Sequence, residues 1–153
     1  MTAAASDSLL ELSRYLYLAG ALPFFVLGTA HALATPLAPS DVKGLSPSDP
    51  QLAEAMTRSG LRLTRRTDMW RAWVGFNFSH SLGALVFAAF VFVTGRSASV
   101  FAIEAHIGVP FALVVSVVYL ALARRYWFRT PFRGCLLAAS LFFAAWITGM
   151  MGS

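Results

Sequence analysis

The sequence has few charged residues. Only 12% of its 153 residues are Asp, Glu, Lys or Arg, whereas 58% are hydrophobic. Polar side chains are therefore too scarce to cover the surface of a water-soluble domain of this size. The composition predicts a membrane protein, so the net charge of +5 is expected to set its orientation in the bilayer rather than to bind nucleic acid.

Cysteine and the common catalytic motifs are also lacking. Cys135 is the single cysteine, which excludes an internal disulfide and a CxxC redox pair. The chain has no Gly-rich phosphate loop, no GxSxG elbow, no HExxH pair and no acidic cluster for magnesium. These absences set several enzyme classes aside. They leave open whether the protein is an enzyme and which cofactor, if any, it uses.

What the sequence does contain is four apolar stretches of the length that crosses a bilayer, which needs roughly 20 helical residues. We expect the spans at residues 15–37, 70–94, 99–123 and 131–151, with residues 1–14 as a frayed or interfacial lead-in. The sequence thus predicts an all-α fold, a four-span transmembrane helix bundle formed by residues 1–153 as a single domain.

A signal peptide is the alternative interpretation of the first span. Ala32-Leu33-Ala34, before Thr35, resembles a cleavage site. A signal peptide would, however, begin with positive charge, and here Asp7 and Glu11 precede a lone Arg14. The apolar run is also long for a signal peptide, so we favour a membrane span.

The basic residues gather in two of the three predicted loops. Ten of the twelve lie in or beside the loops after the first and third spans, and only Arg14 and Arg96 lie on the other side. Cytoplasmic loops carry an excess of Lys and Arg. The sequence therefore predicts a bacterial inner-membrane protein with both termini outside the cytoplasm.

An amphipathic helix is expected in the first cytoplasmic loop, at about residues 50–66. Asp49 is a suitable N-cap, and Pro50 suits the first helical position. One interpretation is a basic face solvated near anionic lipid headgroups. The other is a lid or a partner-docking helix at the mouth of the bundle.

Two polar or small faces lie side by side on the second span. Gly75, Ser79 and Gly83 recur every four residues, a pattern that lets membrane helices approach closely and that predicts a homo-oligomer or partner contact. Asn77 and His80 lie one turn apart on the neighbouring face. Polar groups inside an apolar helix are costly unless they are satisfied, so we expect this second face to point inward.

The depths of the polar residues predict which of them meet. Counting from the cytoplasmic ends at about 1.5 Å per residue, Tyr119, His31, Asn77, Ser116 and His80 lie at about 7, 9, 10, 12 and 15 Å. We therefore predict a polar pocket in the cytoplasmic half of the bundle. Trp73 and Ser81 are expected to add to its lining.

A second polar locus is expected in the outer half of the third span. Glu104 and His106 lie there, two residues apart and hence on different helical faces. Pro110 has no backbone N–H, so the carbonyl of His106 loses its helical donor. That oxygen is left for a ligand, a water molecule or a neighbouring helix.

Three roles remain open for His31 and His80. They could be axial ligands of a haem or ligands of another metal. They could bind, and in the case of His80 and Asn77 help to transform, a small lipophilic molecule such as a lipid, quinone or isoprenoid. They could also join helices as structural polar contacts, in a membrane or partner-binding subunit without catalysis.

The second span also carries the most distinctive run of the chain, Trp-Arg-x-Trp-x-Gly-Phe-Asn-x-Ser-His-Ser-x-Gly at residues 70–83. Together with the four-span plan, this run resembles small, poorly characterised bacterial integral membrane proteins. The resemblance extends over roughly the whole chain. It implies the membrane location and the four-span fold, and it implies no activity.

Overall fold

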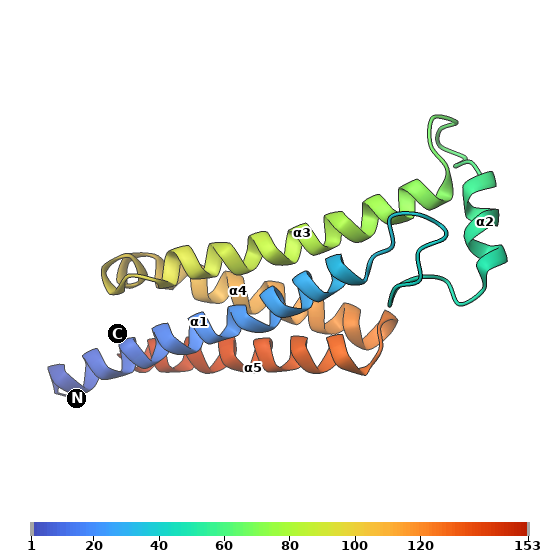
Figure 1. The fold of residues 1–153 in the computed structure, drawn as a ribbon. Coiled ribbons are helices and arrows are strands. Elements are labelled where there is room, and N and C mark those ends of the chain that lie inside the picture. The colour runs from blue at the N-terminus through green and yellow to red at the C-terminus, as the bar shows by residue number, and fades with distance from the viewer. Residues whose placement is uncertain (1, 153) are drawn as a thin grey trace. The chain divides into compact units, whose positions relative to one another are not determined.

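The structure, a computed structural model that describes residues 2–152, is built from helices (Figure 1). Four of the helices are long and apolar enough to cross a membrane, which confirms the predicted fold class. The elements in chain order are α1 (Ala3–Ala34), α2 (Pro50–Arg58), α3 (Met69–Gly95), α4 (Ala98–Tyr126) and α5 (Arg129–Gly152).

Helix α1 begins much earlier than the sequence indicated. Residues 3–14 are helical and continue directly into the apolar span, so the expectation of a frayed lead-in was wrong, whereas an interfacial position stays a prediction. The reason is packing against α5. The buried Ser13 hydroxyl donates to the carbonyl of Ala145 at 2.7 Å, and the Ser6 hydroxyl donates to the carbonyl of Gly152. Tertiary contacts of this kind, rather than local propensity, supply most of the stability of a helix.

Helix α2 is shorter than predicted. The predicted cap is confirmed, because the side chain of Asp49 accepts a hydrogen bond from the Gln51 N–H at 2.9 Å. The helix nevertheless ends at Arg58 instead of near residue 66. Ser59 is extended, and its carbonyl accepts from the N–H of Met69, next to an isolated bridge between Gly60 and Asp68. This pairing with the start of α3 competes with further helical turns.

The chain divides into two compact units. Unit 1 comprises residues 1–27 and 85–153, and unit 2 comprises residues 28–84. Helices α1 and α3 each contribute one part to each unit. The two units are described separately below.

Unit 1 has an aromatic core. Tyr17 packs against Phe101 and Phe142, with ring centroids 5.5 and 5.7 Å apart, and Phe24 packs edge to face on Phe87 at 4.7 Å. Helices α4 and α5 run antiparallel and pack along each other (Figure 1). Small residues of these two helices are fully buried at the contact, which lets the backbones approach; they include Ala112, Ala138 and Ala145.

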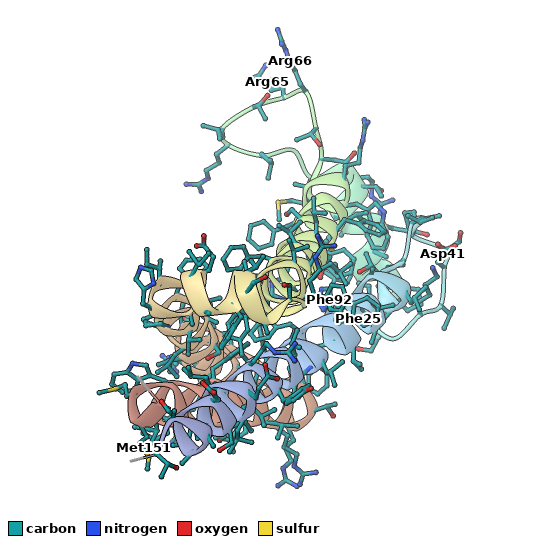
Figure 2. All side chains as sticks on the ribbon, turned by 90° about the vertical axis from the view of Figure 1, so that its left-hand side faces the viewer. Phe25, Asp41, Arg65, Arg66, Phe92 and Met151 are labelled. Atoms are coloured by element: carbon teal, nitrogen blue, oxygen red, sulfur yellow. The ribbon has the colours of Figure 1, made fainter. Side chains whose placement is uncertain are left out.

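Unit 2 combines the last turns of α1, the loop that holds α2, and the first half of α3. The loop folds back on the end of α1, since the Leu45 N–H donates to the carbonyl of Ala34 at 3.0 Å. Figure 2 shows Asp41 on this loop, and Arg65 and Arg66 at the tip of the segment between α2 and α3. Both arginines are exposed.

A candidate polar site in unit 2

The candidate site is centred on a hydrogen bond between α1 and α3. Nε2 of His31 lies 2.9 Å from Oδ1 of Asn77. The Asn77 amide nitrogen donates to the carbonyl of Trp73, one turn earlier, at 2.8 Å. Because a carbonyl can only accept, this second bond fixes which end of the amide faces His31.

The amide orientation determines the tautomer of His31. Oδ1 of Asn77 is an acceptor, so Nε2 of His31 must carry the hydrogen. In the neutral ring, Nδ1 then holds the lone pair. His31 therefore presents the lone pair of Nδ1 on the side of the ring away from Asn77, just as a hydrogen bond to one ring nitrogen fixes the role of the other in many histidine sites.

His80 lies against His31. The two imidazole rings meet edge to face, with centroids 4.9 Å apart. Both rings and the Asn77 side chain are half-buried, so the cluster is neither sealed in a core nor fully open. The structure thus brings together three of the residues that the depth comparison selected.

The loop after α1 closes the end of the helix next to this cluster. The Thr35 hydroxyl donates to the carbonyl of His31 at 2.8 Å, and the Lys43 ammonium donates to the carbonyl of Thr35 at 3.4 Å. The indole N–H of Trp70 reaches the carbonyl of Leu37 at 3.4 Å. Sequence reasoning missed these loop contacts, because contacts between a loop and a helix end leave no periodic pattern.

The same loop contains a group with a shifted pKa. Oδ2 of Asp41 accepts from the N–H groups of Leu37 and Ala38 at 2.8 and 3.0 Å. These backbone donors, first that of Ala38 and then that of Leu37, lower the pKa of the Asp41 carboxyl, and the charge of Lys43 acts in the same direction. The ionised carboxylate therefore shapes the turn that follows α1.

The contact between the rings of His31 and His80 argues against a haem held between them. Axial ligands hold an iron between them, whereas the rings of His31 and His80 are in direct contact. Nε2 of His31 is also engaged with Asn77. Among residues 2–152, no group of three or more His, Cys, Asp or Glu side chains is arranged to hold a metal ion. The residues present do not fit a haem in this arrangement.

The remaining predicted pocket residues lie in different places. Ser81 is buried and its hydroxyl donates to the carbonyl of Asn77, while Trp73 stacks at a tilt on Trp70 with centroids 5.3 Å apart. Ser116 and Tyr119 belong to unit 1. Ser116 is buried, and its hydroxyl donates to a backbone carbonyl of its own helix. The ring centroids of Tyr119 and Phe24 lie 5.2 Å apart. A cavity shared by these two residues and the histidines stays a prediction.

The second predicted locus lies on α4 in unit 1. Glu104 and His106 are both exposed. His106 lines a groove that also includes Pro110, whereas Glu104 is not part of its lining. The groove thus includes one of the two residues of the second predicted locus, and a shared role for both stays a prediction.

The small residues of α3 face outward. Gly75, Ser79 and Gly83 are all exposed, and a Cβ atom added at Gly75 would meet nothing within 4 Å. This face makes no close helix contact within the part of the chain that the structure describes. The predicted homo-oligomer stays a prediction.

Comparison of the chain with family models, with curated proteins and with solved structures found no match.

Proposed function

We propose that this integral membrane protein binds the polar head of a small lipophilic molecule, such as a lipid, quinone or isoprenoid, at His31, Asn77 and His80. The observation that carries the proposal is the contact between two half-buried imidazoles, one of which has its tautomer fixed by Asn77. Joining two helices needs only the His31–Asn77 hydrogen bond. His80 brings a second imidazole against the first, and two ionisable side chains in contact within a membrane span support a functional site.

The chemistry of the cluster suits a carbonyl or hydroxyl head group. Neutral histidine offers one donor and one acceptor, and the hydrogen bond to Asn77 leaves the lone pair of His31 on Nδ1. His80 places a second imidazole against that of His31. If the bound molecule is also transformed, His80 is the proton carrier and Asn77 orients the head group.

Native mass spectrometry of the gently extracted protein tests this proposal. We expect a bound small-molecule mass in the wild type, and its occupancy is expected to fall at least about ten-fold in His80→Ala and Asn77→Ala, the loss expected for about 1.4 kcal/mol of binding energy. Ser79→Ala is the matched control, because Ser79 is polar, adjacent in sequence and exposed. The proposal fails if no mass is bound or if all three variants retain it.

A structural role is the second candidate, and the hydrogen bond between His31 and Asn77 favours it. Polar bonds between membrane helices stabilise a bundle without any ligand. This role predicts that Asn77→Ala lowers the unfolding temperature while any bound mass is unchanged. The same preparations thus distinguish the two functions.

The charge distribution supports a proposal for the orientation of the protein in its membrane. We infer that the protein lies in a bacterial inner membrane with both termini outside the cytoplasm. The excess of Lys and Arg in the first and third loops supports this orientation.

A further inference from the structure

Unit 1 contains a groove of about 300 Å³ that is open on one side. It lies between the N-terminal part of α1, the first half of α4 and the C-terminal part of α5, and its volume falls at the lower end of the range for small-molecule sites. The lining residues used below are Ser13, Ala102, His106, Pro110 and Trp146. Most of the lining is apolar, as expected for a groove that faces lipid.

Two side chains in this groove have polar groups without a partner. Within residues 2–152, neither the imidazole of His106 nor the indole N–H of Trp146 makes a hydrogen bond. The Ser13 hydroxyl, by contrast, donates a hydrogen bond to the carbonyl of Ala145 at 2.7 Å. His106 and Trp146 are both exposed, so their polar groups are accessible to a molecule in the groove.

The backbone adds a third polar group to the same place. Pro110 lies inside α4 and cannot donate, so the carbonyl of His106 lacks its usual helical donor. The groove therefore combines two donors, the indole N–H and the one N–H of a neutral His106 ring, with acceptors from the His106 carbonyl and the other ring nitrogen. A hydroxyl group, which donates and accepts, matches this set.

The depth and charge of the groove narrow the ligand class. His106 lies eight residues into α4, or about 12 Å from its start, and Trp146 lies about 9 Å from the end of α5. These depths are close to one membrane interface. No Asp, Glu, Lys or Arg lines the groove, so an ionised head group would find no counter-charge.

We propose that the groove binds a neutral lipid alcohol, with its hydroxyl between His106 and Trp146 and its alkyl chain along the apolar lining. This site is independent of the polar cluster in unit 2, because it shares no residue with that cluster. His106, which the sequence assigned to the second polar locus, thus binds the hydroxyl of the proposed ligand.

Photolabelling with two matched probes tests the proposal. One probe is a long-chain primary alcohol with a diazirine near its head, and the other is the same chain without the hydroxyl. The alcohol is expected to label residues 98–110 and 145–150 about five-fold more than the alkane, the difference expected for about one net hydrogen bond. Trp146→Phe and His106→Leu should each reduce labelling by the alcohol toward that by the alkane.

A filling variant provides the steric test. Ala102 lines the groove and is exposed, so Ala102→Phe is expected to block labelling without disturbing the core. Ile103→Phe adds a ring at the neighbouring exposed position, which does not line the groove, and should leave labelling unchanged. Equal labelling by both probes, or full labelling of a folded Ala102→Phe variant, would overturn the proposal.

Discussion

The Nε2–H of His31 donates to Oδ1 of Asn77 across 2.9 Å, joining residues that are 46 positions apart. The bond connects the last turns of α1 to the first half of α3. It also sets the protonation pattern of the ring that touches His80. One contact therefore contributes both to the packing of unit 2 and to the chemistry of its polar cluster.

A double-mutant cycle measures this bond. His31→Ala, Asn77→Ala and the double variant are expected to show a coupling of about 0.6–2 kcal/mol in the free energy of unfolding, the range for polar contacts between membrane helices. A control cycle combines His31→Ala with Ser79→Ala. These two effects should be additive, because the Ser79 hydroxyl donates to the carbonyl of Phe76 in its own helix. Additivity in both cycles would contradict the assigned hydrogen bond.

A side chain at position 20, in place of Gly20, is predicted to disturb the packing of the core of unit 1. A Cβ atom at this position would lie 2.6 Å from the ring of Phe142, which is fully buried between Tyr17 and Phe87. Because this ring is buried and packs against two other rings, Gly20→Ala should destabilise the protein by about 1–3 kcal/mol. Thermal unfolding in detergent provides the measurement.

Gly75→Ala is the control for this steric argument. Gly75 lies in an equally apolar helix but has no neighbour within 4 Å, so Ala there should be neutral or should stabilise the helix by about 0.5–1 kcal/mol. If both variants unfold at the same temperature as the wild type, the close approach at Gly20 is wrong. The comparison separates a steric effect from a helix-propensity effect.

Tyr17 is predicted to stabilise unit 1 through its hydroxyl as well as its ring. The hydroxyl lies 2.9 Å from Oγ1 of Thr94, and Thr94 donates its own hydrogen to the carbonyl of Phe90 or Val91. Tyr17 is therefore the donor. Tyr17→Phe should cost about 1 kcal/mol in unfolding free energy, whereas the exposed Tyr126→Phe should cost almost nothing. Equal stability of Tyr17→Phe and the wild type would show that the bond is not formed.

Span length and apolar composition were enough to predict the four membrane helices, because both are properties of short windows of sequence. The helical rise likewise placed His31 and Asn77 at nearly the same depth, and the structure has them in contact. These inferences need no knowledge of how distant segments pack.

Other features depend on tertiary contacts and were missed for that reason. The early start of α1 follows from bonds between Ser6 or Ser13 and the carbonyls of α5, which no local pattern encodes. The end of α2 follows from pairing of Ser59 with Met69. The groove beside His106 is formed by three helices, so the sequence indicated its polar residue and its proline but not its shape.

The predicted orientation can be tested with fusions to alkaline phosphatase, which is active only outside the cytoplasm. Fusions at the C-terminus and at Ser97 should be active, and fusions at Ser48 and at Phe128 should be inactive, because the loops at 48 and 128 are rich in Lys and Arg. The Arg14 guanidinium donates to the carbonyl of Gly95 at 3.2 Å, so the N-terminal part of α1 and the end of α3 lie at the same end of unit 1. The reverse pattern of activity would refute the orientation.

The turn after α1 is predicted to loosen in acid. Hydrogen bonds from the backbone of Ala38 and then Leu37, with the charge of Lys43, lower the pKa of Asp41 in the folded protein. A group whose pKa is depressed on folding stabilises the fold above its unfolded pKa of about 3.9, and that contribution is lost as the pH falls through the lower, folded value. Amide exchange at Leu37 and Ala38, corrected for its intrinsic pH dependence, should therefore show protection that declines below about pH 4.

Two variants make this prediction specific to Asp41. Asp41→Asn keeps an acceptor oxygen but has no charge to titrate, so protection at Leu37 and Ala38 should be weaker at neutral pH and should no longer change in acid. Glu54→Gln removes an exposed carboxylate elsewhere in unit 2, on α2, and should leave the wild-type profile unchanged. If Asp41→Asn kept the acid transition, another group would have to control the turn, and the role assigned to the carboxylate would be wrong.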